Sequence, residues 1–302
     1  MTLETFSYLA MVSSAVLYLL AMVAHAGEWA SSGKLAAEKP DDHSEDASRI
    51  RADSLGRMGV ALTIIGALAH AVGVVTRGIA AHRAPWGNMY EFATSALLMI
   101  VLAYLIIAFW TKQRWLGLFV TLLLTLGQGL AVTEFYVQIA PLVPALHSVW
   151  FIIHIIMACI AGAAFNIGAL ASIVYLLRLR MDEKAARTGV PARGYLARLD
   201  LNKVDLLAYR MTAFAFPVWT FTIAAGAVWA EYAWGRYWGW DPKETWSLVT
   251  WVIYAAYLHA RVTAGWRGRP AAILAVIGML SFWFNFIGVN LLMKGLHSYA
   301  GI

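Results

Sequence analysis

Tryptophan is concentrated in one short stretch of the sequence. Of 14 tryptophans in 302 residues, five fall within residues 229–246: Trp229, Trp234, Trp238, Trp240 and Trp246. The residues between them include small and charged ones: Gly235, Gly239, Asp241, Pro242, Lys243 and Glu244. An aromatic belt at a membrane surface explains one or two tryptophans per helix end. Glycines between indoles permit tight turns that lay the rings against a flat ligand. The stretch therefore favours a surface for a flat aromatic molecule over a belt alone.

Two histidines flank this stretch at positions suited to metal ligation. If the flat ligand carries iron at its centre, it needs axial donors, normally from His or Met. His154 stands near the start of one apolar segment, and His297 follows the last one. His147 precedes His154 by two helical turns and shares its face if the helix extends that far back. We expect ligation by His154 and His297, and backbone hydrogen bonding at His43 and His82.

The elements that must position these side chains are membrane-spanning helices. The mean hydropathy is +0.66, 61% of residues are hydrophobic and only 13% are charged. A soluble domain carries roughly 25% charged residues, so a water-soluble globular enzyme is excluded. Lipid offers no partner for unpaired backbone groups, so apolar segments of spanning length should be helices. Eight are predicted: 5–27, 57–76, 91–110, 115–133, 151–177, 211–230, 245–260 and 271–293.

The distribution of basic residues predicts the orientation. Eighteen of the 23 Lys and Arg residues fall in the odd-numbered connections, and five fall on the other side. The positive-inside rule then places the odd connections in the cytoplasm and both termini outside the cell. The net charge of +6 reflects these loops, so no nucleic-acid partner is expected.

The chain divides into two unequal parts. Residues 1–56 hold the first span and a cytoplasmic linker, in which 28–56 mixes acidic and basic groups and is typical of a flexible, solvated segment. Residues 57–302 form the larger transmembrane domain. Its basic 178–210 loop is predicted to be partly helical along the membrane surface. A single cysteine, Cys159, excludes an internal disulfide and a CxxC motif.

Four segments resemble a known family. The stretch WAEYAWGRYWGWDPKETWSLVTWVIYAAYLHAR resembles the tryptophan-rich WWD signature of haem-handling proteins, here a loop at about 229–251. GNMYE (87–91), LVPALHSVWFIIH and NFIGVNLLMKGLHSYA resemble segments of the CcsA/ResC family of system II cytochrome c biogenesis. The resemblance runs from about Arg77 to the C-terminus, with the 178–210 loop as a gap.

The resemblance implies roles for individual residues. His154 and His297 correspond to the two external axial ligands of haem, and His259 corresponds to the transmembrane histidine. His147 stands where some members have glutamine, so it is not expected to be a ligand. The WWD residues expected to line the porphyrin are Trp234, Trp238, Trp240 and Trp246. Asp241, with Lys243 and Glu244, is expected to address haem propionates or a substrate peptide, or only to form surface ion pairs.

The implied activity is haem delivery across a bacterial plasma membrane, with covalent attachment outside. Haem b (iron protoporphyrin IX) would enter near His259 and reach the outer face, where an apocytochrome c presents CXXCH. A ResB/CcsB-type membrane subunit is the implied partner, and holocytochrome c synthase activity is expected only together with it. The second inner ligand is expected from that partner, although His25 lies at a similar depth. No catalytic residue is assigned.

Two other classes of function remain open on the sequence alone. A haem-containing membrane electron carrier would also use paired histidines at two depths, but it does not need a Trp/Gly loop open to water. A transporter without haem leaves His154, His297 and the tryptophans as coincidences. The roles of His25, His70, His82 and His147 stay undecided; for His70 a hydrogen bond to a neighbouring helix is as good an interpretation as ligation.

Overall fold

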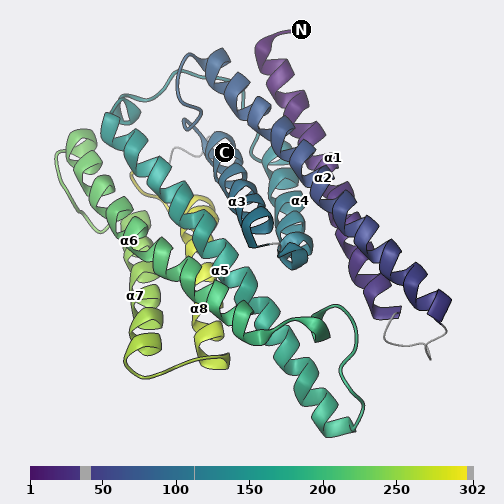
Figure 1. Cartoon of the computed structure of the whole chain (residues 1–302). Coiled ribbons are helices and arrows are strands. Elements are labelled where there is room, and N and C mark those ends of the chain that lie inside the picture. Colours follow the sequence, from purple (N-terminus) through teal and green to yellow (C-terminus); the bar gives the residue numbers. More distant parts are fainter. Residues whose placement is uncertain (35–41, 112, 298–302) are drawn as a thin grey trace.

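The computed structural model describes residues 1–34, 42–111 and 113–297, and every regular element in these ranges is helical (Figure 1). The α-helices are α1 (Leu3–Lys34), α2 (Asp42–Ala81), α3 (Met89–Thr111), α4 (Gly117–Thr133), α5 (Val149–Thr188), α6 (Leu201–Trp234), α7 (Pro242–Val262), α8 (Arg269–Trp283) and α9 (Val289–Leu292). Short turns are η1 (Arg114–Leu116), η2 (Pro144–Leu146), η3 (Leu196–Arg198) and the π-helical η4 (Phe284–Gly288). The predicted all-α class is confirmed.

Seven helical segments of the described chain are long and apolar enough to cross a membrane. They are α1, α2, α3, η1 with α4, α5, α6, and α8 through α9. The predicted span 245–260 does form a helix, α7, which packs along α8. This helix is not apolar enough to be counted among the seven, because it carries charged and ionisable residues, among them Lys243, Glu244 and Arg261. The protein is thus an all-α, multi-pass integral membrane protein of seven or eight spans.

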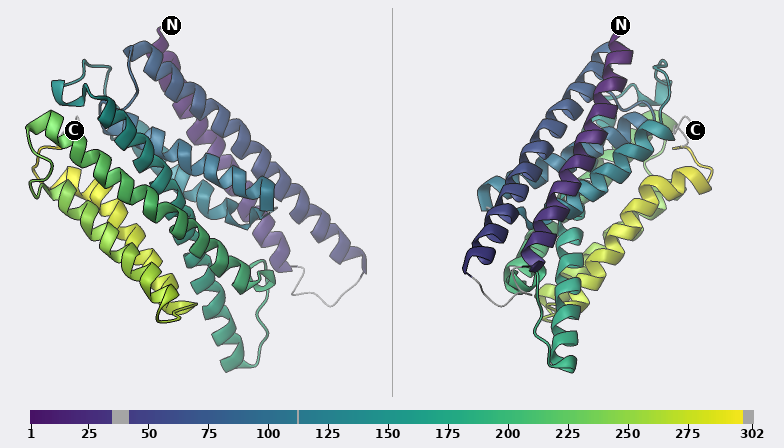
Figure 2. Two further views of the ribbon diagram at one scale, coloured as in Figure 1. Left: turned by 60° about the vertical axis from the view of Figure 1, so that its left-hand side comes forward. Right: turned by 90° about the vertical axis from the view of Figure 1, so that its right-hand side faces the viewer.

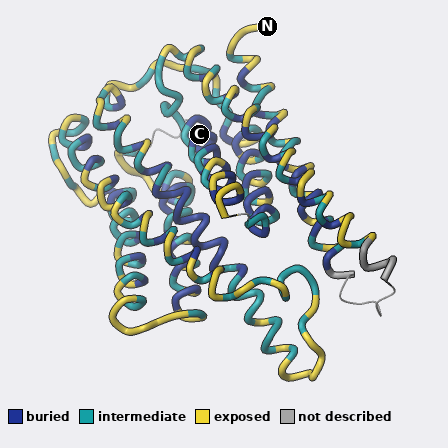
Figure 3. Tube along the Cα trace, in the orientation of Figure 1, coloured by how far each residue is buried: buried dark blue, intermediate teal, exposed yellow. Residues whose placement is uncertain are grey.

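The helices form two groups around a buried centre. The α1–α2 hairpin and α4 lie on one side, and α6, α7 and α8 lie on the other (Figures 1 and 2). Between them run α3 and α5, which have the largest buried share of the spans (Figure 3). Small residues on α5, such as Ala161 and Gly162, are buried, and they let neighbouring helices approach closely. The start of α1 and the end of α9 lie toward the same end of the bundle.

The segments predicted as loops are more helical than expected. Residues 28–34 and 42–56 continue α1 and α2, and only 35–41 of the predicted linker lie outside the described residues. The two helices hold each other through close packing, since the Leu55 side chain lies against Gly27. In the basic 178–210 loop, α5 runs without a break to Thr188, so the predicted partial helix is present as an extension of the span. Sequence polarity alone did not show that these helices continue past the apolar core.

A buried ion network fixes the C-terminal end of α2 and the N-terminal end of α3. The Glu91 carboxylate, fully buried, accepts from Arg77 Nε at 2.9 Å, from Arg83 Nη1 at 2.6 Å and from the Gly87 N–H at 2.8 Å. Arg77 also donates to the Val137 carbonyl at 2.7 Å. One carboxylate therefore holds α2, α3 and the 82–88 turn together, which explains the acidic residue of the GNMYE segment.

Replacing this carboxylate should destabilise the fold. Glu91→Gln leaves two guanidinium groups without their shared counter-charge, and breaking buried pairs costs about 3–5 kcal/mol. The melting temperature in detergent should drop by several degrees. Glu134→Gln, at an exposed position after α4, should stay within about 0.5 kcal/mol of the parent. Equal melting temperatures for both variants would contradict the role assigned to Glu91.

Candidate functional site

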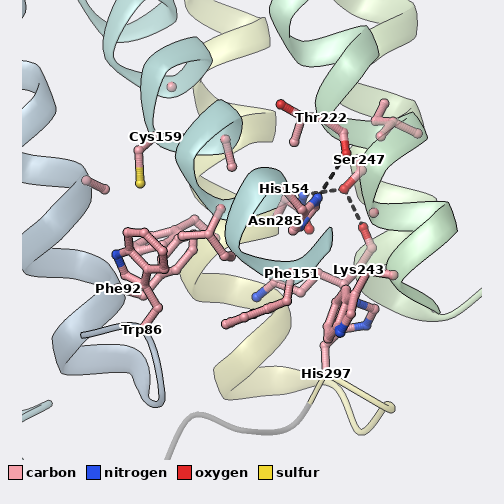
Figure 4. A pocket seen from close by; sticks show the side chains of 18 of the residues that line it. Trp86, Phe92, Phe151, His154, Cys159, Thr222, Lys243, Ser247, Asn285 and His297 are labelled. Atoms are coloured by element: carbon pink, nitrogen blue, oxygen red, sulfur yellow. Dashed lines mark hydrogen bonds between the residues drawn. The ribbon is translucent and has the colours of Figure 1, made fainter. Parts of the chain in front are cut away.

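A cavity of about 170 Å³ opens among α3, α5, α6, α7 and η4 (Figure 4). Its wall is mainly apolar and aromatic. The aromatic residues that line it include Trp86, Phe92, Phe151, Trp219, Trp229, Trp238 and Trp283. His154 and His297 both line it, so the two histidines that the sequence singled out lie at one cavity.

His154 is held by the backbone of the neighbouring helix. It stands in the second turn of α5, whose start is fixed by Ser148, which accepts from the Trp150 N–H. The His154 Nδ1 lies 2.9 Å from the Thr222 carbonyl oxygen on α6. A carbonyl can only accept, so Nδ1 carries the proton and Nε2 keeps its lone pair. This is the usual arrangement of metal-ligating histidines, in which an acceptor bonded to the other ring nitrogen fixes the tautomer and the orientation of the ring.

A glycine makes this contact possible. A Cβ atom at Gly226, one turn after Thr222 on α6, would lie 2.7 Å from His154 Nδ1. The imidazole can therefore approach the backbone of α6 this closely only because residue 226 has no side chain.

His297 is held by a carboxylate. Its Nδ1 lies 2.9 Å from Asp241 Oδ2, and the Asp241 Oδ1 accepts from the Leu296 N–H at 2.6 Å. Burial opposes ionisation of Asp241, but the hydrogen bonds from His297 and Leu296 prevail and lower its pKa to about 2. The carboxylate is thus ionised at neutral pH, and Nδ1 donates to it. As at His154, the Nε2 atom remains for a ligand. Asp241 lies behind His297, not in the cavity wall.

Trp229 lies next to both imidazoles. Its ring centroid is 5.8 Å from that of His154, nearly parallel at 25°, and 5.4 Å from that of His297, edge-on at 70°. Its indole N–H donates to the Ala145 carbonyl at 2.7 Å, which fixes the ring. The sequence placed Trp229 in the cluster without assigning it a role. Its position beside both histidines could be seen only in three dimensions.

The four tryptophans expected to line the porphyrin have different surroundings. Trp238 lines the cavity, and Trp234 packs against His297 with centroids 4.8 Å apart. Trp240 is 68% exposed and has a positive φ of 59°, and Trp246 packs on Phe284. Only Trp238 and Trp234 therefore adjoin the cavity or its histidines directly.

The loop between α6 and α7, residues 235–241, carries Trp238 and Trp240 and is pinned at its end. Glu244 Oε2 accepts from the Gly239 N–H at 2.8 Å and from the Asp241 N–H at 3.0 Å, completing a capping box at the start of α7. Arg236 lies against Gly239 and 3.4 Å from Glu244. The loop is thus held in one shape by its own residues.

A π-helical turn brings a further polar group to the cavity. Asn285, on η4, is 5% exposed and donates from Nδ2 to Ser247 Oγ at 2.9 Å. Among the residues that the structure describes, its buried Oδ1 has no hydrogen-bond partner. Single π-helical turns occur frequently at functional sites because they re-aim side chains. Nothing in the apolar pattern of 271–293 pointed to this turn.

The other histidines lie elsewhere. His259 is exposed near the end of α7 and does not line the cavity. His70 is fully buried, with Nδ1 3.1 Å from the Tyr18 hydroxyl on α1, which is the hydrogen bond to a neighbouring helix that the sequence left open as one of two interpretations. His25 lies in the same half of the protein beside Glu28, across the bundle from α7. His82 and His147 are exposed.

The donor set suits an iron already held by other ligands. Within residues 1–34, 42–111 and 113–297, no group of three His, Cys, Asp or Glu side chains is placed to hold a metal ion. A bare metal ion usually requires three or four protein ligands. Two imidazoles with free Nε2 atoms match instead an iron that needs only its axial positions filled.

Comparison with known proteins gives consistent matches. A family model described as "Cytochrome C assembly protein" matches residues 86–297. "Cytochrome c biogenesis protein CcsA" of Porphyra purpurea is 35% identical over 284 residues, covering 83% of this chain and 89% of its own length. The protein of that name from Synechococcus sp. (strain JA-3-3Ab) is 34% identical over 300 residues, covering 82% and 86%.

A solved structure shares the fold. "Cytochrome c Heme Lyase CcmF" aligns with 99% of this chain at a TM-score of 0.60 and 14% sequence identity. This chain spans about half of that protein, since 53% of the CcmF chain is covered. At this identity the likeness concerns the arrangement of helices alone.

Alanine substitutions at Gly226 and Gly129 should have opposite effects on the stability of the protein, because only Gly226 is in close contact with another side chain. Gly226→Ala forces the His154 ring away from Thr222 and should destabilise the protein by about 1–3 kcal/mol. Gly129→Ala, where a Cβ would have nothing within 4 Å, should instead stabilise by roughly 0.5–1 kcal/mol through helix propensity. Thermal unfolding in one detergent measures both. A stabilised Gly226→Ala would show that the His154 ring is not confined by α6.

Proposed function

Because the chain belongs to the CcsA family of cytochrome c biogenesis proteins, as its motifs predicted, we propose that it binds haem b between His154 and His297 and presents it to an apocytochrome c. Its role in cytochrome c assembly follows from the family. The axial ligands, the haem type and the attachment step are the proposed part.

One observation supports the proposal more than any other. Two imidazoles line a single cavity, and each donates a hydrogen bond from Nδ1 to a protein oxygen, the Thr222 carbonyl or the Asp241 carboxylate. The Nε2 atom of each imidazole is thereby kept for a ligand. Trp229 contacts both rings, and the surrounding wall is aromatic, as a porphyrin surface requires. The residues present therefore fit a haem, and His154 and His297 are the groups that would hold its iron.

The protein's own contribution is orientation and ligation. The haem supplies the reactive vinyl groups, and the CXXCH cysteines of the apocytochrome supply the thiols that add across them. The only thiol of this chain, Cys159, is buried in the cavity wall on α5. Histidines fixed through Nδ1 would keep the porphyrin at one tilt, and the CXXCH histidine would have to displace one of them.

The inner entry site is proposed at His259. Its exposed position near the end of α7 suits a ligand pair completed by another subunit, for which a ResB/CcsB-type protein is proposed. His25 belongs to the α1–α2 side and is not proposed as the second ligand. The basic residues are concentrated in the odd-numbered connections. On the positive-inside rule, the end of the bundle that holds the cavity therefore faces out of a bacterial plasma membrane, and both termini lie outside.

Loss of either external imidazole should stop cytochrome c assembly. His154→Ala and His297→Ala each leave an open axial position, which added imidazole can fill. Covalent haem on a reporter cytochrome c should fall at least tenfold and recover in part with imidazole. The control is His147→Ala, an exposed residue seven positions before His154. Normal maturation in His154→Ala would refute its ligand role.

His259→Ala should impair the inner haem site without changing the ligands of the outer one. His259 lies at the other end of α7 from Asp241, about 27 Å along the helix at 1.5 Å per residue. The variant should contain less haem while the remaining haem keeps a bis-histidine absorption spectrum. Full occupancy with an altered spectrum would instead place His259 at the outer haem.

A further inference from the structure

Lys243 carries a charge at the cavity that the protein does not neutralise by contact. It is the second residue of α7 and lines the cavity together with His154 and His297 (Figure 4). Its backbone N–H donates to Asp241 Oδ2 at 3.2 Å. In the described part of the chain, its ammonium group makes no hydrogen bond or ion pair.

The neighbouring charges are already engaged. Asp241 binds His297 and the Leu296 N–H. Glu244, the other charged residue of the cavity wall, accepts from Gly239 and Asp241 and lies near Arg236. Neither carboxylate is therefore free to take Lys243 as its main partner.

An ammonium group in this position is unfavourable without a counter-charge. Removing a cation from water costs several kcal/mol unless an anion or hydrogen-bond acceptors compensate. Burial lowers the pKa of Lys243 to about 8, although the Asp241 charge acts in the opposite direction. The group still carries its charge at neutral pH, beside a mainly apolar wall.

We propose that Lys243 is a subsite for a carboxylate of the cavity ligand. The inference rests on the proposed function, on which the ligand is haem and the carboxylate is one of its two propionates. An ion pair here would fix the rotation of the porphyrin in its own plane, which axial ligands alone leave free. That rotation determines where the vinyl groups meet the CXXCH thiols.

The test compares haem with haem dimethyl ester, whose propionates are uncharged. Both are titrated into the purified full-length protein in detergent, as the parent, Lys243→Met, Lys243→Arg and Lys294→Met. A hydrogen bond between charged groups should favour free-acid haem about tenfold or more in the parent. Lys243→Met should bind both forms equally, and Lys243→Arg should keep part of the preference. Lys294→Met, at an exposed position outside the cavity wall, should behave as the parent.

The outcomes distinguish this subsite from the proposed function itself. Equal affinity of the parent for both forms, or an undiminished preference in Lys243→Met, overturns the subsite while a bis-histidine spectrum upholds haem binding. A parent that binds neither form at the two histidines refutes the proposed function. If Lys243→Met does not fold, Lys243→Arg decides. A preference for free-acid haem in Lys243→Arg as large as in the parent and in Lys294→Met overturns the subsite, and a reduced preference in Lys243→Arg alone supports it.

Discussion

The Asp241 carboxylate joins three parts of the site that are far apart in the sequence. It caps α7, it holds the C-terminal segment through the Leu296 N–H, and it orients His297. These bonds also keep it ionised, with its pKa lowered to about 2, so the acceptor is available at any physiological pH. The position of one imidazole thus depends on the same group that starts α7 after the tryptophan-rich loop 235–241. On the other side, the backbone carbonyl of Thr222 performs the equivalent task for His154.

The two halves of the bundle have different roles. The α1–α2 side buries polar residues that pair across helices, such as His70 with Tyr18, and the Arg77–Glu91 network closes the end at which α2 finishes and α3 begins. That network also holds the 82–88 turn, and so supports Trp86 at the cavity wall. The chemistry proposed for the chain is concentrated on α5 through the C-terminal segment, within the residues that match the family model.

Long apolar runs made the helical membrane fold predictable, because lipid leaves the backbone little alternative. The same rule could not place the ends of α1, α2 and α5, which continue as polar helices once a neighbour supports them. The histidine pair could be proposed from residue type and position, and both side chains do line one cavity. The hydrogen-bond acceptors that hold these histidines could not be predicted, because Thr222 accepts through its backbone carbonyl, and Asp241 accepts from His297, which lies 56 residues further along the chain. The tryptophans show the same limit, because composition cannot distinguish exposed Trp240 from buried Trp229.

The proposed function requires that His154 and His297 together fill both axial positions of one haem iron. Electron paramagnetic resonance of the purified, oxidised protein tests it most directly, since spin state reports axial ligation. Ligation by both histidines should give a low-spin ferric signal typical of two imidazole ligands. A high-spin signal from haem bound at this cavity, which means an axial position without a strong protein ligand, would contradict it.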